Sequence, residues 1–421
     1  MTEYEGHRVG VEYEAGTALT AYAETIDVDP SKLGELAGPI AEVAAYTQRC
    51  SDFENVDPSD LLFGAGSDGF ELTIRHAVGA DWRRSFAVTD WALDQLITDR
   101  LKAPSRLREF GRSDGENYRR ALANFANEVV QAKSDEGRRY LVRVVDLPGT
   151  GPTVRAFVSD KYQKLDNFQI LGPTIKALET RLADDTVQVD TFGVDDTHFH
   201  LGVTLRDVSG ATTTGAPTGH VPGTYLQPGS GLERGDEFFG GFWFRNSEVG
   251  AGATELAPRI FRVVCNNGLI VEDLAWRRPH RKLTGYGNIR RGGERGLDWV
   301  IEKEIREGIV RSIESFPALI EAFGEAANEA EVEPIARLRT IGKVSGLTQT
   351  QTDHLIFGLA EEAEGRDTRA GVVNAITRTA QKESEVGDRR KLEALGGYVL
   401  RLPEPEYVRL YNPAKLEEEA V

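Results

Sequence analysis

The spacing of hydrophobic residues changes along this 421-residue chain and divides it into three regions. In residues 88–101 and 117–132 apolar residues recur every three or four positions, which predicts two helices. Residues 31–50 are a further helix candidate, interrupted by Gly38-Pro39, and residues 70–79 alternate as a strand does. The first region, residues 1–135, is therefore expected to be mostly helical.

The second region, residues 136–297, is dominated by strand patterns. Residues 139–146 and 152–160 are predicted strands joined by a Pro/Gly turn, and a predicted helix follows at 167–183. Three longer strand patterns come next, at 197–208, 235–249 and 258–271. Residues 209–235, rich in Thr, Gly and Pro, are expected to form an inserted loop or a surface arm. Gly240-Gly241 inside a strand predicts a bulge or a close backbone approach.

The third region, residues 298–421, has a helical period, and Pro317 is expected to kink or divide its first helix. Together the three regions predict an α+β fold, with a central antiparallel sheet built from 139–160 and 197–271 and flanked by N-terminal and C-terminal helices.

A hairpin turn is expected inside 258–271, because Asn-Gly tolerates the positive φ that a tight turn requires. The prediction places the reversal at Asn267-Gly268, with positive φ at both residues. Cys265 is then a small buried residue, and no partner placed by the sequence supports an alternative role as a nucleophile.

Composition and charge limit the cellular setting. Forty per cent of residues are hydrophobic, no apolar run approaches the roughly 20 residues of a membrane span, and the first residues are acidic. With only two cysteines, neither a disulfide framework nor a thiolate metal cage is expected. These features predict a cytoplasmic protein that does not enter membranes. The net charge of −17 argues against broad coating of DNA.

One segment departs from this acidity. Residues 276–295 hold seven Lys and Arg residues against a single acid, or 7 − 1 = +6. Guanidinium groups pair with phosphate oxygens and aromatic rings stack on bases, which suits a single-stranded nucleic acid. The alternative is a surface loop whose charges pair with neighbouring acids. The residues expected to bind nucleic acid are Arg277, Arg278, Arg281, Lys282, Arg290, Arg291, Trp276 and Tyr286.

Two other segments carry candidate chemistry. In the aromatic strand Phe238–Phe244, Trp243 is expected in the core, and stacking on bases is the alternative. His198 and His200 share a strand face just after Asp195 and Asp196, a spacing that could hold a metal ion if a third ligand such as His220 or His280 approached.

Several segments in a fixed order resemble a family of phage- and plasmid-like proteins, a domain of unknown function found on phages, plasmids and prophages. They are ITDRLKAPSRLREF (97–110), SDKYQKLDN (159–167), NSEVGAGATELAPRIFRVVCNNGLIV (246–271) and GVVNAITRTAQKES with DRRKLEALGG (371–397). The resemblance covers most of residues 85–400, and the 209–235 loop is an insertion by comparison. It implies a mobile-element context and carries over no activity.

The sequence contains no Walker A, GxSxG or HExxH pattern, so no common enzyme class and no cofactor is indicated. The favoured hypothesis is a nucleic-acid-binding accessory protein of a phage or plasmid, a homo-oligomer that binds or anneals single-stranded DNA in recombination or replication. A noncatalytic structural or protein-interaction component and a metal-dependent hydrolase centred on His198 and His200 are the alternatives.

Overall fold

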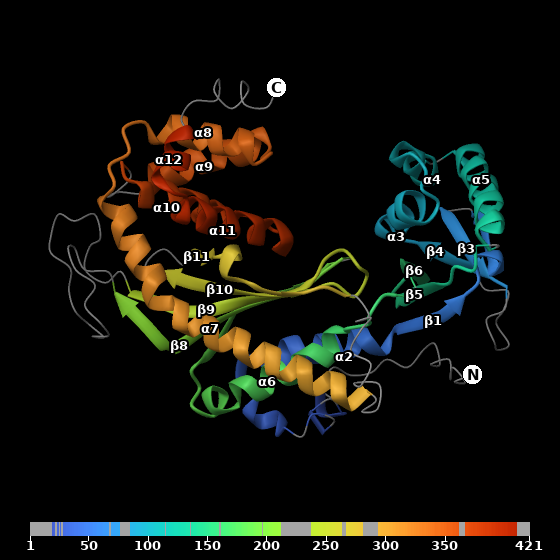
Figure 1. Cartoon of the computed structure of the whole chain (residues 1–421), viewed down its shortest axis with the longest axis horizontal. Coiled ribbons are helices and arrows are strands. Elements are labelled where there is room, and N and C mark those ends of the chain that lie inside the picture. The colour runs from blue at the N-terminus through green and yellow to red at the C-terminus, as the bar shows by residue number, and fades with distance from the viewer. Residues whose placement is uncertain are drawn as a thin grey trace.

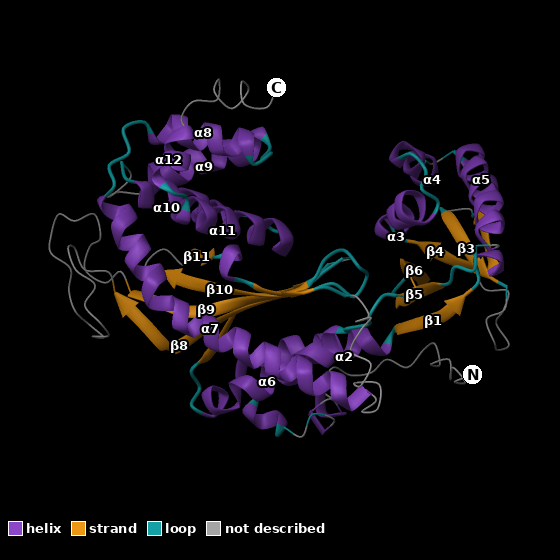
Figure 2. Cartoon of the chain, viewed as in Figure 1, coloured by secondary structure: helices purple, strands orange, loops and turns teal. Residues whose placement is uncertain are grey.

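Two separate sheets organise the chain, each with its own helices, in the computed structural model (Figures 1 and 2). The structure describes residues 19–21, 23–24, 26, 28–66, 69–75, 85–113, 115–134, 136–159, 161–195, 197–211, 237–262, 267–280, 294–361 and 367–410.

The first sheet has the strand order β1-β5-β6-β4-β3-β2, in which only the β4–β6 pair is parallel. Its strands are β1 (Cys50–Val56), β2 (Leu61–Ala65), β3 (Phe70–Ile74), β4 (Ser85–Val88), β5 (Tyr140–Leu147) and β6 (Gly151–Ser159). Alternate buried residues of β2 and β3 pack in one core with α3 (Asp90–Asp94), a π-helical turn (Gln95–Arg100) and α5 (Glu116–Ser134), and α4 (Arg108–Arg112) contacts α3 and α5. Thr89 caps α3 by accepting the Ala92 N–H, as its position before the helical pattern predicts.

The second sheet has the order β11-β10-β9-β8-β7, and β12 pairs with the end of β10. Its strands are β7 (Val187–Val194), β8 (Phe199–Ala211), β9 (Glu237–Asn246), β10 (Thr254–Arg262), β11 (Asn267–Ile270) and β12 (Trp276–Arg278). On one face, which we call the apolar face, Phe and aliphatic side chains of β8, β9 and β10 meet α2 (Ala37–Gln48), α6 (Asn167–Ala183) and α7 (Glu294–Asn328).

The opposite face of this sheet lies under α11 (Val386–Arg401), and we call it the polar face. The helix contacts both edge strands: the place of a Gly193 β-carbon in β7 is 2.6 Å from Val386, and Gly397 abuts the Ile270 carbonyl of β11. In Figure 1, α11 lies above the sheet as part of a bundle with α8 (Pro334–Val344), α9 (Gln349–Glu361), α10 (Arg369–Ala380) and α12 (Glu404–Arg409). This helix therefore crosses the whole polar face.

The α+β class is confirmed, but the prediction of one central sheet is wrong. Residues 139–160 form β5 and β6, which pair with β1 and β4 and not with the strands of 197–271. The region expected to be mostly helical supplies β1 to β4. Alternation predicted β3, but the sequences of β1, β2 and β4 carry little alternation, so periodicity missed these three strands.

The predicted pair of antiparallel strands exists, but the chain does not reverse at Asn267-Gly268. Both residues are already in β11, paired with Arg262 and Phe261, and residues 263–266 lie outside the described part of the chain. Gly268 does not have a positive φ. A β-carbon there would meet the Arg259 guanidinium, with Cζ and Nε each at 2.6 Å. Position 268 therefore requires glycine because a larger residue would collide with Arg259, and not because the backbone has a turn conformation there.

The paired glycines of β9 behave as predicted. A β-carbon on Gly241 would collide with the Val203 carbonyl of β8, and one on Gly240 would lie 2.6 Å from Val208. Beside them the β8–β9 register shifts between Leu205 and Ser209, which is a bulge in β8.

Residues 246–250 (NSEVG) join the two sheets. The Glu248 carboxylate accepts from Arg155 of β6 at 2.6 Å and from the Asn167 N–H that begins α6 at 2.7 Å. Its carbonyl accepts from Arg143 of β5 at 2.7 Å, and the Val249 carbonyl accepts from Gln95 at 2.7 Å. The Glu248 carboxylate and the two backbone carbonyls therefore form a buried connection between the sheets.

No described helix is both long and apolar enough to cross a bilayer.

Candidate functional site

The described part of the predicted nucleic-acid segment is strand β12 and its flanks. Arg277 extends from the sheet with 48% of its side chain exposed, whereas Arg278 is only 11% exposed and pairs with Glu304 of α7. Trp276 is half-buried and packs against the core of the apolar face. Arg281, Lys282, Tyr286, Arg290 and Arg291 lie outside the described residues. Of the described set, Arg277 alone is both charged and well exposed.

Arg277 belongs to an arginine cluster around one buried carboxylate. Glu255 of β10, with 2% of its side chain exposed, pairs with Arg277 at 2.8 Å, with Arg245 of β9 at 3.3 Å and with Arg390 of α11. Glu272 is the second acid, 2.6 Å from Arg390 and 3.7 Å from Arg277. Three guanidinium groups against two carboxylates give 3 − 2 = +1.

The donors of this cluster are not all used. The Nε atoms of Arg245 and Arg390 are buried without a hydrogen-bond partner in the described structure. Burial lowers the pKa of Arg245, and the charge of Arg390 acts in the same direction. Burial also opposes ionisation of Glu255, but the arginines outweigh it and lower the pKa of this carboxyl group. Unused N–H groups beside excess positive charge suit an anionic ligand.

Strand pairing connects this cluster to the histidine pair. His200 of β8 is the register partner of Arg245, Arg245 of Glu255, and Glu255 of Arg277. These four residues form a row across the sheet, here called the cross-strand row. The row therefore connects two separate candidate segments. His200 of the histidine pair lies at one end, and Arg277 of the basic segment lies at the other.

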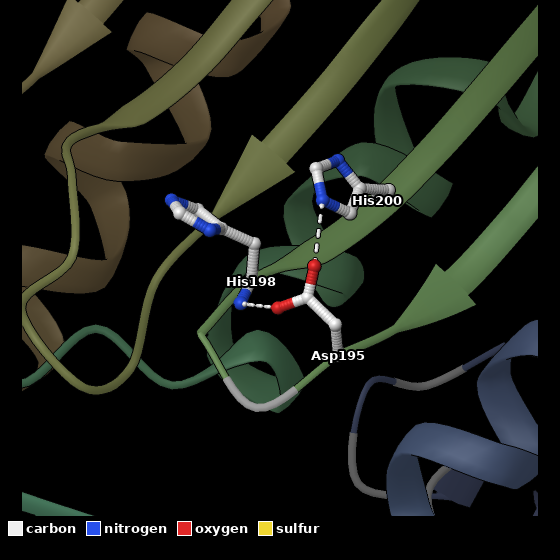
Figure 3. A group of neighbouring side chains, drawn as sticks. All are labelled: Asp195, His198 and His200. Carbon is white, nitrogen blue, oxygen red and sulfur yellow. Dashed lines mark hydrogen bonds and ion pairs between the residues drawn. The ribbon is translucent and has the colours of Figure 1, made fainter. Parts of the chain in front are cut away.

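Asp195, His198 and His200 meet at the β7–β8 turn (Figure 3). One ligand atom from each lies within 4.8 Å of the others. The Asp195 Oδ1 atom accepts the N–H groups of Thr197 and His198, each at 2.7 Å, and fixes the turn. The Oδ2 atom lies 3.4 Å from His200 Nε2, within ion-pair range. The turn itself therefore holds the carboxylate against the histidines.

The surroundings of both histidines favour the neutral form of the imidazole. Burial lowers the pKa of His198 to about 4, and the charge of Arg245 adds to this effect. Burial likewise lowers the pKa of His200, although Asp195 opposes the shift. Burial disfavours the charged form of Asp195, but its contacts with His200 and Thr197 outweigh burial and lower the pKa. The cluster thus combines two neutral imidazoles and one carboxylate.

The other proposed third ligands are not in this cluster. His280 stacks on Tyr162 with ring centroids 5.2 Å apart and lies 3.3 Å from the Thr254 hydroxyl. His220, Asp196 and Cys265 are outside the described residues. Trp243 is fully buried, as expected, with the Arg259 guanidinium 5.4 Å from its ring centroid.

The sequence did not single out Arg245, Glu255 or Arg390. Arg245 and Glu255 are charged residues in strands rich in apolar residues, which is a signal for a buried charged pair. Arg390, in contrast, comes from a helix 135 residues along the chain from Glu255, and no local pattern links the two.

Comparisons with family models, curated proteins and solved structures found no match to this chain. The resemblance to phage- and plasmid-like proteins stays a prediction, and the functional argument rests on the site.

Proposed function

We propose that this protein binds nucleic acid, with single-stranded DNA as the ligand, and serves as an accessory protein of a mobile element in recombination or replication. One observation carries the proposal: three arginines share the Glu255 carboxylate at the point where the +6 segment begins. A buried carboxylate that serves three guanidinium groups leaves positive charge for a phosphate to balance.

The structure changes the roles of the predicted residues. Arg277 is the described contact we assign to phosphate, because its guanidinium group is half exposed beside the cluster. Arg278 and Trp276 instead anchor the segment, one through Glu304 and one through the core. Arg281, Lys282, Arg290 and Arg291 supply further phosphate contacts in this proposal, and Tyr286 supplies stacking.

The test is fluorescence anisotropy of a labelled oligothymidine, titrated with the full chain at several salt concentrations. The test variant replaces Arg277, Arg281 and Lys282 by Ala. The control variant also removes three positive charges, from exposed arginines of the first sheet and its helix, namely Arg120, Arg138 and Arg139. The control variant keeps the fold in this account, because exposed ion pairs contribute little stability. In the test variant the buried Glu255 carboxylate loses Arg277 but keeps Arg245 and Arg390, and thermal melting checks that the variant is folded.

We expect the test variant to bind more weakly and to lose up to about 0.7 units of salt slope per phosphate contact. The control variant should change far less. Equal weakening in both variants would reduce the effect to overall charge and contradict the proposal. If the unmodified protein does not bind at any salt concentration, the proposal fails and the protein-interaction hypothesis takes its place.

A further inference from the structure

We infer that Asp195, His198 and His200 form a binding site for a divalent first-row transition-metal ion at the β7–β8 turn. The inference does not depend on nucleic-acid binding. It rests on the three ligand atoms that lie within 4.8 Å of one another and on the unused nitrogens of both histidines.

The ligand set has the chemistry of an open metal site. Two imidazoles and one carboxylate suit Zn²⁺ and Fe²⁺, and three protein ligands leave positions for solvent or substrate.

Unpartnered nitrogens favour a ligand over a purely structural role. His198 Nε2 and His200 Nδ1 are buried without a hydrogen-bond partner in the described structure, whereas His200 Nε2 faces the Asp195 carboxylate at 3.4 Å. A buried polar atom without a partner costs about 1–3 kcal/mol, so native proteins rarely keep several together. Only 3% of the His200 side chain is exposed. A metal ion would use one nitrogen of each imidazole.

The surroundings are preorganised and accessible. The Thr197 hydroxyl lies 2.8 Å from His198 Nδ1, which fixes the orientation of that ring. Backbone N–H groups hold the carboxylate of Asp195, whose side chain is 39% exposed and opens the cluster to solvent. The backbone of His200 is fixed because this residue belongs to strand β8.

The nearby arginines define the kind of ligand that completes the site. Arg245 is the register partner of His200, so positive charge lies beside the histidines and disfavours a bare cation there. The same field favours an anion, such as hydroxide or a phosphate oxygen, in the remaining positions of the metal. We therefore assign the site to a metal ion with an anionic exogenous ligand, and Arg245 to the residues that face that ligand.

Isothermal titration of the chelator-treated full chain with Zn²⁺ tests the inference, with thermal melting as a second readout. Asp195→Asn removes one charge but leaves an Oδ1 atom that can still accept the turn N–H groups. His198→Ala removes one imidazole ligand, and the side chain that it replaces is half-buried. The matched control is His354→Ala, since His354 is a partly exposed histidine of α9 outside the cluster.

We expect one Zn²⁺ per chain, with the affinity reduced about tenfold or more in Asp195→Asn and in His198→Ala and unchanged in His354→Ala. Zn²⁺ should raise the Tm of the unmodified protein and of His354→Ala more than that of the two ligand variants. Absence of stoichiometric binding by the unmodified protein would overturn the inference. Equal affinity in all four proteins would also overturn it. Neither result would change the expected DNA binding of the arginine cluster.

Discussion

The two faces of the second sheet are both buried, but they are closed by different forces. On the apolar face, Phe242 and Phe244 meet the aliphatic residues of α6 and α7, so burial of hydrocarbon stabilises the contact. On the polar face, Arg259 forms a bidentate pair with Glu393 of α11, at 2.9 and 3.0 Å, and a further pair with Asp190 of β7. Because successive side chains of a strand point to opposite faces, the same strands contribute to an apolar core on one face and to buried ion pairs on the other.

The difference between the two faces is the reason why we assign ligand binding to the polar face. A buried ion pair stabilises a fold less than apolar residues of the same volume do, because removing charges from water costs free energy. Packing alone would therefore not favour arginines, histidines and carboxylates under α11. The cross-strand row, with its unpartnered nitrogens, supports our assignment of ligand binding to the polar face and of stability to the apolar face.

The largest expected effect compares neighbouring residues that point to opposite faces. Phe242 and Trp243 are both fully buried, the first on the apolar face and the second beneath α11. Replacing either by Ala should lower the free energy of unfolding by about 3–5 kcal/mol. Chemical denaturation measures both. A Trp243→Ala protein that unfolds like the unmodified chain would show that the polar face is not a packed core.

A smaller effect is expected where glycines make room for Arg259. A β-carbon at Gly268 would overlap the guanidinium group, whereas one at Gly202 would lie 3.2 Å from Nη1. Gly268→Ala should therefore displace Arg259 from Glu393 and destabilise the protein by about 1–3 kcal/mol, and Gly202→Ala should cost less. The comparison of their denaturation midpoints sharpens the assignment, and the reverse order would contradict the close packing of Arg259 against β11.

The smallest effect concerns pH. Because the folded-state pKa of His198 is about 4 and that of an unfolded histidine is about 6.5, the unfolded chain binds more protons between these values. This contribution to stability is complete above about pH 6.5 and is lost as the pH falls towards 4. His198→Gln should flatten the dependence by on the order of 1–2 kcal/mol. Identical pH profiles for the two proteins would show that His198 is not held neutral on this face.

Local patterns predicted much of the fold. The helical spacing of 167–183 and 117–132 gave α6 and α5, and alternation gave β3 and most of β8. The spacing failed for β1, β2 and β4 because their sequences show little alternation, and it could not show that β5 and β6 belong to another sheet. Strand partners depend on contacts between distant segments, which local spacing does not contain.

The candidate site was predicted only in part. The spacing of His198 and His200 placed them together, and Asp195 stood beside them in the sequence. The arginine cluster could not be predicted, because Arg390 reaches Glu255 across 135 residues. The charge excess at 276–295 pointed to β12, but the pairing of Arg278 with Glu304 depends on how α7 packs.

Hydrogen exchange measured with and without single-stranded DNA tests the assignment of ligand binding to the polar face most directly. We predict slower exchange at β12 and the preceding turn Glu272–Leu274, and at the first turn of α11, with unchanged exchange in α6 on the apolar face. Protection confined to the first sheet or to α6, in a protein that binds the DNA, would contradict the account.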